Sequence, residues 1–343
     1  MKRQFYMPAF ADQPIVPIVV YGLGAIGLEV ARLALSKRSI RLVGVIDSDP
    51  QKIGKDLSVL LGESEPRGLK VVSSLDSAIA AGARLAIHST RSFLPDVQAQ
   101  LRTLLNAGLS IVSSTEELAF PAFRYPDLAR ELDAIARANG RHVLGTGVNP
   151  GFVMDTLPLV VTGLSQQVSQ ISIQRVVDAS KRRRNLQAKI GAGMTAGEFE
   201  ALLQAGKMGH VGLVESVALM AAGLGWAIDR IEEEILPVLA TETLHSAHFT
   251  VPPGHVSGLK QKAIGYRDGA EAITLSLEMA LGAKEPRDQG LLVSRPDLSW
   301  LIPGGVMGDA ATAAVLLNAA PRLLETSPGL KTMLDLPLPR SIS

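Results

Sequence analysis

The chain has 343 residues, of which 47% are hydrophobic, and its formal net charge is +1. This length predicts more than one domain, and the small net charge argues against nucleic-acid or anionic-membrane partners. The sequence contains no cysteine, which excludes disulfides and cysteine-ligated metals and is compatible with a cytoplasmic protein. No stretch reaches the roughly 18 uninterrupted apolar residues that a membrane helix needs. Residues 1–14 lack the pattern of a signal peptide and are expected to form a mobile tail.

The first clear element is an apolar run at residues 18–21, which predicts a strand buried on both faces. The G-x-G-x-x-G turn after it consists of Gly22, Leu23, Gly24, Ala25, Ile26 and Gly27. Its glycines would permit a tight turn, close approach of a pyrophosphate and close packing of helix on strand. Ile26, Val30 and Leu33 then recur at helical spacing, and a helix N-terminus offers free N–H groups to phosphates. All six residues of the turn are therefore predicted to bind a dinucleotide.

A second apolar strand, at residues 42–46, ends on Asp47. An acidic residue about 20 positions after such a turn is expected to bond the ribose of the cofactor. Asp47 favours NAD, because a carboxylate repels the 2′-phosphate of NADP. Lys52 and Lys55 are close enough in sequence to offset that repulsion, so the expected cofactor is NAD or NADP.

Strands and helices then alternate along the chain. Strands are expected at residues 71–72, 85–87, 109–113 and 142–144, and helices at 75–81, 95–105 and 127–138. This alternation predicts an α/β fold, a doubly wound parallel sheet of the Rossmann type over residues 1–155. Ligands bind such sheets at the carboxyl ends of the strands, where His88, Ser89, Thr90 and Asn149 are expected to contact the cofactor. A structural role is the alternative for His88, and capping of a turn for Asn149.

The pattern changes after residue 155. A strand is expected at 171–177, helices at 195–204 and 214–222, and a further strand at 248–251. Residues 262–266 and 272–280 flank Asp268 and Gly269, which indicates an antiparallel hairpin. We therefore predict an α+β substrate and dimerisation domain over residues 156–300, and a homodimer by analogy with other open sheets. A last helix at about 309–323 is expected to return to the first domain, within a C-terminal segment of residues 301–343. The basic run 181–184 is expected to be a solvated face, with binding of an acidic substrate as the alternative. His210 is expected to be a loop residue, with lining of the pocket as the alternative.

Three segments carry a resemblance to a known family. They are V-S-S-T-E-E-L at residues 112–118, G-T-G-V-N-P-G-F-V-M-D at 145–155 and V-D-A-S at 177–180. With the glycine turn, they resemble the 2,4-diaminopentanoate dehydrogenases and related native amine dehydrogenases, which are built like dihydrodipicolinate reductase. The resemblance covers most of the chain. It implies NAD(P)-dependent oxidative deamination of an amine to a ketone or aldehyde, and reductive amination with ammonia in reverse. It also implies that a carboxylate of the first segment faces the amine, either Glu117, which we prefer, or Glu116.

The chemistry of that reaction explains why a carboxylate suits it. Hydride can leave only from a neutral amine, so a general base must first remove the proton of the ammonium. The carboxylate then faces a cationic iminium, with an attraction of about 4 kcal/mol at 4 Å and an effective dielectric near 20. One glutamate suffices for the proton steps, and no metal is required. Without the resemblance, Glu116 and Glu117 would be interpreted as acids that complement a helix dipole.

Other functions remain open at this point. A dihydrodipicolinate reductase would carry a histidine-rich segment with a lysine and a D-A-P-S-G-T run, and neither occurs here. A non-catalytic NAD(P) sensor would bind the cofactor without turning over amines. An alcohol or hydroxy-acid dehydrogenase on the same scaffold would need a lysine or histidine in the place of Glu117.

Overall fold

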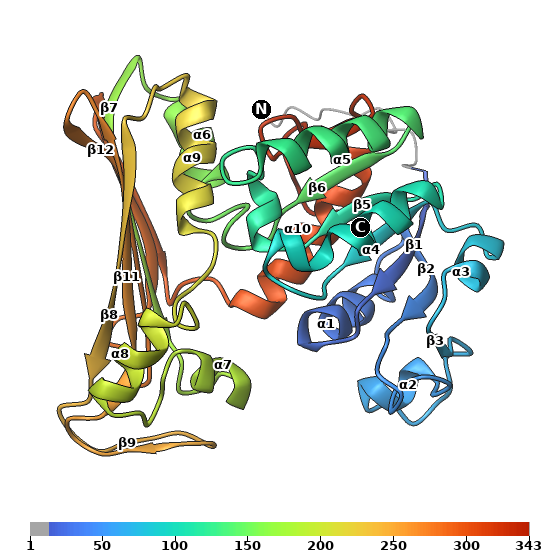
Figure 1. The fold of residues 1–343 in the computed structure, drawn as a ribbon, viewed down its shortest axis with the longest axis horizontal. Coiled ribbons are helices and arrows are strands. Elements are labelled where there is room, and N and C mark those ends of the chain that lie inside the picture. Colours follow the sequence, from blue (N-terminus) through green and yellow to red (C-terminus); the bar gives the residue numbers. More distant parts are fainter. Residues whose placement is uncertain (1–13, 343) are drawn as a thin grey trace, which may run out of the picture.

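The computed structural model describes residues 14–342 and contains two large sheets (Figure 1). The tail expected at residues 1–14 lies outside the described residues, except for Pro14. Within that range, seven parallel strands form the first sheet, in the order β15-β6-β5-β4-β1-β2-β3. They are β1 (Val16–Tyr21), β2 (Ile40–Ile46), β3 (Val71–Val72), β4 (Leu85–His88), β5 (Ser110–Ser113), β6 (His142–Gly145) and β15 (Gly329–Lys331). The predicted parallel sheet is confirmed.

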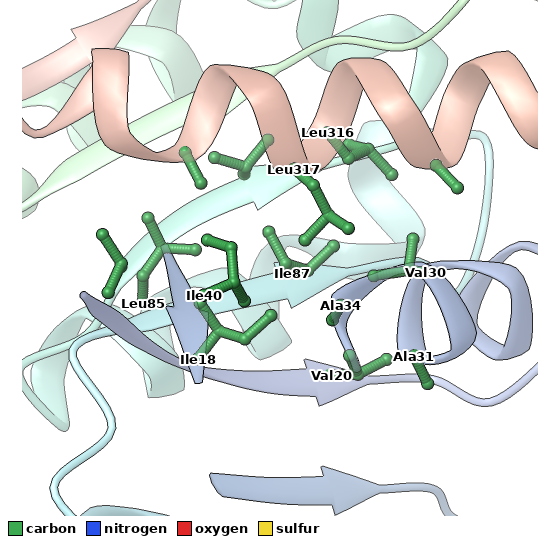
Figure 2. Packing of buried hydrophobic residues seen from close by; sticks show 14 of the residues in the cluster. Ile18, Val20, Val30, Ala31, Ala34, Ile40, Leu85, Ile87, Leu316 and Leu317 are labelled. Atoms are coloured by element: carbon green, nitrogen blue, oxygen red, sulfur yellow. The ribbon is translucent and has the colours of Figure 1, made fainter. Parts of the chain in front are cut away.

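Helices cover both faces of the first sheet (Figure 1). One face packs against α1 (Ala25–Ala34) and α10 (Gly308–Leu323), and the other against α3 (Asp76–Ala80), α4 (Leu94–Asn106) and α5 (Pro126–Ala138). The short α2 (Leu57–Leu61) follows β2. Figure 2 shows Ile18 and Ile87 of the sheet in one cluster with Val30 of α1 and Leu317 of α10. The last helix therefore returns to the first domain, as predicted.

The second sheet has six strands among the described residues, in the order β14-β13-β7-β12-β11-β8. They are β7 (Gln167–Asp178), β8 (Arg230–Leu239), β11 (Val256–Arg267), β12 (Ala270–Ala280), β13 (Arg287–Arg295) and β14 (Leu298–Pro303). Only β7 and β12 pair in parallel, so the prediction of a mostly antiparallel sheet is confirmed. The predicted hairpin joins β11 to β12 through Asp268 and Gly269, both of which have positive φ angles, 53° and 76°.

The sequence pattern does not reveal β8, because Glu232 to Glu234 and Pro237 interrupt its apolar residues. As an edge strand, β8 tolerates a proline and a row of charges. The strand predicted at 248–251 is shorter in the structure, where β10 (Thr250–Val251) pairs with β9 (Leu244–His245).

Helices cover one face of the second sheet. These are α6 (Thr156–Thr162) and α9 (Leu213–Leu224), which lie on the side turned toward the first sheet, together with α8 (Ala196–Gln204) near β8 (Figure 1). The short α7 (Arg184–Lys189) follows β7. The opposite face exposes leucine side chains, among them Leu236, Leu291 and Leu301. No helix in residues 14–342 combines the length and the apolar character that crossing a membrane requires.

Candidate active site

A cavity of about 460 Å³ lies between the carboxyl ends of the first-sheet strands and the second sheet. The turn after β1 contributes Gly24, Ala25 and Ile26 to its lining, and the loop after β4 contributes Ser89 and Thr90. These five residues, predicted to bind the cofactor, are thus brought together. The segments after β5 and β6, the N-terminus of α10 and the second domain also line it. The cavity occupies the position at which doubly wound sheets bind their ligands.

The glycine turn has the geometry that a dinucleotide needs. Gly22 has a φ of +93°, and a Cβ there would lie 2.5 Å from the Ser89 carbonyl oxygen. A Cβ on Gly27 would lie 1.8 Å from the Gly22 oxygen, so only glycine allows α1 to approach the turn. At Gly24, by contrast, a Cβ would find no atom within 4 Å, which leaves this backbone open to a ligand. Since α1 begins at Ala25, its free N–H groups face the same space. The residues present therefore fit a pyrophosphate.

Asp47 lies at the end of β2, beside the glycine turn. Its Oδ2 accepts hydrogen bonds from the Leu23 N–H at 2.7 Å and from Lys52 Nζ at 3.0 Å, and its Oδ1 accepts from the Asp49 N–H at 2.8 Å. Burial raises the pKa of Asp47, but these bonds outweigh it and hold the pKa below the usual range. The carboxylate is therefore ionised and fixed in place, and Lys52 neutralises part of its charge.

His88 is fully buried and does not line the cavity. Its Nδ1 lies 2.8 Å from Ser113 Oγ and its Nε2 2.8 Å from Gln100 Oε1, while its ring stacks on Tyr21. Burial lowers the pKa of His88 to about 4, so the ring is neutral at neutral pH. Ser113 Oγ in turn donates to Thr115 Oγ1. The contacts of His88 thus connect the ends of β4 and β5 from beneath the cavity.

The two candidate glutamates begin the short 3₁₀ helix η1 (Glu116–Ala119) and point in different directions. Glu116 lines the cavity. Glu117 is buried and is not among the residues that line it. The Oε2 of Glu117 accepts a hydrogen bond from the Leu94 N–H at 2.7 Å, and its Oε1 accepts one from the Tyr125 hydroxyl at 3.1 Å. Glu117 therefore caps the first turn of α4, whereas Glu116 is available to a ligand.

The surroundings of Glu116 make it a stronger base than an exposed glutamate. Burial raises the pKa of Glu116, and the nearby charge of Glu117 acts in the same direction. The ammonium of Lys189 and a hydrogen bond from Ser92 oppose this rise without cancelling it. Lys189, the last residue of α7, itself lines the cavity. A carboxylate with a raised pKa in a cavity is suited to exchange protons near neutral pH.

Asn149 and His210 form a second polar group in the cavity. Asn149 is buried, and its Nδ2 lies 3.2 Å from His210 Nε2. Among the described residues no group donates to its Oδ1. Burial lowers the pKa of His210 to about 4, and the charge of Lys189 adds to that effect. The sequence placed Asn149 in the site. For His210 it favoured a loop position and left lining of the pocket as the alternative, and the structure shows His210 in the cavity lining.

Several cations of the second domain also line the cavity, and the sequence did not predict this. Arg175 of β7 forms a buried ion pair with Asp288 at 2.7 Å. Arg182 and Arg183, expected on a solvated face, both pair with Asp309 at the start of α10, at 2.8 and 3.3 Å. Their only signal in the sequence was the basic run itself. Within residues 14–342, no cluster of three or more histidine or acidic side chains is arranged to hold a metal ion.

Comparisons with known proteins identify the family of the chain. The family model for the C-terminal domain of 2,4-diaminopentanoate dehydrogenase matches residues 152–343. The 2,4-diaminopentanoate dehydrogenase of Acetoanaerobium sticklandii is 31% identical over 339 residues, which cover 95% of both chains. An amine dehydrogenase of Streptomyces virginiae is 23% identical over 94% of this chain and 97% of its own.

A solved structure supports the fold. The amine dehydrogenase from Mycobacterium smegmatis superimposes with a TM-score of 0.84 at 23% identity, over 95% of this chain and 97% of that one. The match of the family model to more than half of the chain, and the identity to a relative over nearly its whole length, lead to one conclusion. The chain belongs to the 2,4-diaminopentanoate dehydrogenase family.

Proposed function

We propose that Glu116 is the general base of this NAD(P)-dependent amine dehydrogenase, which deaminates an amine oxidatively and aminates a ketone or aldehyde in reverse. The observation that carries the proposal is the position of Glu116 in the cavity beside the cofactor turn, with a pKa raised by burial. An ammonium substrate gives its proton to Glu116, and the neutral amine that results can release hydride. The nicotinamide, when bound, accepts that hydride. After Glu116 passes that proton to solvent, its carboxylate faces the cationic iminium and takes a proton from the water that hydrolyses it.

Glu117 acts on the reaction through Glu116. Its carboxylate is engaged by the Leu94 N–H and the Tyr125 hydroxyl, and its own N–H donates to the Ser92 carbonyl oxygen at 3.3 Å. These bonds tie η1 to the loop before α4, so the position of Glu116 is determined by its neighbour. We assign Glu117 the role of a positioning residue.

The second domain favours a substrate that carries an anionic group. None of the ion pairs among the described residues includes Lys189, although this lysine lines the cavity close to Glu116. A carboxylate on the substrate, at a distance from the reacting amine, would supply a partner for Lys189. The name of the relative from Acetoanaerobium sticklandii specifies such a compound, an amine that is also a carboxylate.

The cofactor side accommodates both NAD and NADP. Asp47 can accept hydrogen bonds from a ribose, while Lys52, 3.0 Å from its Oδ2, can turn toward a 2′-phosphate. Lys52 is partly exposed and therefore has room to move. We expect NAD to be preferred, because the carboxylate remains fixed by the N–H groups of Leu23 and Asp49 in either case.

The uncovered face of the second sheet is proposed to pair with a second copy of the chain. Leu291 and Leu301 lie on this face and are about half exposed, and Leu236 joins them from the opposite edge. Between them, Lys260 and Glu278 form an ion pair at 3.3 Å. In a two-fold symmetric dimer, this face of one subunit would pack against the same face of the other, so the exposed leucines of both subunits would be buried.

The activity is tested by following the reduction of NAD⁺ and NADP⁺ at alkaline pH with 2-aminopentane, 4-aminopentanoate and 4-hydroxypentanoate. Turnover of an amine, with a higher kcat/KM for the carboxylated amine, supports the proposal. Cofactor binding with no turnover of any amine would favour a sensor, and turnover of the hydroxy acid alone would favour an alcohol dehydrogenase.

A further inference from the structure

The feature that the mechanism does not use is the free acceptor of Asn149. This side chain is only 7% exposed and lines the cavity, and no described residue donates to its Oδ1. A buried polar atom without a partner costs roughly 1–3 kcal/mol. Such an atom is accounted for if a ligand supplies the missing hydrogen-bond donor.

The amide of Asn149 lies against His210, and its orientation follows from which ring nitrogen of His210 carries the proton. The Nδ2 of Asn149 lies 3.2 Å from His210 Nε2, and a neutral imidazole can accept a hydrogen bond there. The other neutral tautomer would donate from Nε2 to the main-chain oxygen of Asn149, 3.1 Å away. His210 is fixed in turn by Gln261, which accepts from its N–H at 2.7 Å and donates to its carbonyl oxygen at 2.8 Å. When the ring nitrogen accepts from Nδ2, the Oδ1 of Asn149 has no donor among the described residues, and Asn149 itself lines the cavity.

Asn149 and Glu116 line the same cavity, and the residue after Asn149 lies near Glu116. A Cβ placed on Gly212 would lie 2.4 Å from Cδ of Pro150, the residue after Asn149, and 3.4 Å from Cβ of Glu116. Lys189 lowers the pKa of both Glu116 and His210, so the four polar side chains surround one part of the cavity. Two acceptors, the carboxylate of Glu116 and the Oδ1 of Asn149, are therefore available to one reacting group.

We propose that Asn149, oriented by His210, is the second hydrogen-bond acceptor for the reacting nitrogen and makes the site selective for primary amines. This inference rests on the proposed function. A primary amine and the iminium formed from it each present two N–H groups, one for Glu116 and one for Asn149. A secondary amine or an alcohol presents a single donor and leaves Oδ1 buried without a partner. A site built around such a donor rejects analogues that lack it far more strongly than an apolar pocket rejects a methyl group.

The test compares a primary amine that the enzyme turns over, either 2-aminopentane or 4-aminopentanoate, with its N-methyl derivative. In the wild type we expect kcat/KM for the primary amine to be at least about 100-fold higher, as a lost bond to a buried polar group implies. Asn149→Leu should lose about 10–100-fold on the primary amine and less than about threefold on the N-methyl derivative. Asn149→Asp retains the acceptors and should preserve the selectivity. His210→Leu should reduce the selectivity for the primary amine partially, because the amide of Asn149 is then free to rotate.

Equal losses on both substrates in Asn149→Leu, or an unchanged ratio, would overturn this inference. A second result would also overturn it: a more than tenfold rise in the Kd of NADH or NADPH in Asn149→Leu, with an unchanged ratio of kcat/KM between the primary amine and its N-methyl derivative. The amide would then contact the cofactor and not the reacting nitrogen. Fluorescence titration of NADH and the Tm of each variant establish that the variants are folded. A wild-type protein that turns over no amine refutes the proposed function. Turnover of amines without the change in selectivity refutes only the role of Asn149.

Discussion

The division of roles between Glu116 and Glu117 predicts opposite effects on stability when each is changed to glutamine. Glu117 accepts hydrogen bonds from the Leu94 N–H at 2.7 Å and the Tyr125 hydroxyl at 3.1 Å, at a buried position. A hydrogen bond to a charged group contributes about 1.5–3 kcal/mol, and glutamine keeps only one acceptor oxygen. Glu117→Gln should therefore lose about 2 kcal/mol, which lowers Tm by about 4–8 °C in a domain of this size.

Glu116→Gln should have the reverse effect. The pKa of Glu116 is raised above its ordinary value of 4.5, so ionisation opposes folding as the pH rises through the folded-state pKa. Below pH 4.5 the group is protonated in both states and the penalty is absent. Glu116→Gln should accordingly be at least as stable as the wild type at pH 8, and the difference should disappear near pH 4. Differential scanning fluorimetry at both pH values measures this. A Glu117→Gln protein as stable as the wild type, or a Glu116→Gln protein that loses several degrees at pH 8, would refute the reasoning.

Three further predictions concern charge and assembly. Lys189→Met should move the acid limb of the kcat/KM profile to higher pH, because Lys189 lowers the pKa of Glu116. Lys181→Met, an exposed neighbour outside the cavity, should not move it. Lys52→Ala should lower kcat/KM with NADP⁺ relative to NAD⁺ by about tenfold, or about 1.4 kcal/mol, and initial rates with both cofactors measure the ratio. Leu301→Asp should convert the dimer to a monomer in light scattering, whereas Leu338→Asp, 62% exposed and outside the second sheet, should not. A dimer that survives Leu301→Asp would contradict the proposed interface.

The sequence predicts those parts of the fold in which the hydrophobic pattern of a segment matches its burial in the structure. The strands of the first sheet are covered on both faces, so they appear as continuous apolar runs, and their helices end at glycines such as Gly108 and Gly140. Strand β8 escapes prediction because an edge position tolerates Pro237 and three consecutive glutamates. Strand β15 also could not be predicted from the sequence. It has only three residues and forms a strand because it pairs with β6 in the folded protein.

The site shows the same limit. The glycine turn and Asp47 are found from spacing because a dinucleotide imposes that spacing. Adjacent residues of a 3₁₀ helix point in different directions, so the family resemblance implies that one of Glu116 and Glu117 faces the substrate but not which one. That choice is made by the distant N–H of Leu94 and by Tyr125. Arg175 and Lys189 line the cavity because the second domain packs against the first domain. No local sequence pattern predicts that packing.

The kinetics of the two glutamine variants at pH 9, with saturating NAD⁺ and a primary amine as the varied substrate, test the central claim most directly. Glu116→Gln should lower kcat by about 10²–10⁴-fold, as expected for loss of a general base, and leave the Kd of NADH within about twofold. Glu117→Gln should retain more activity than Glu116→Gln, because glutamine still supplies one acceptor to the Leu94 N–H. Near-normal kcat in Glu116→Gln, with the large loss in Glu117→Gln instead, would contradict the account.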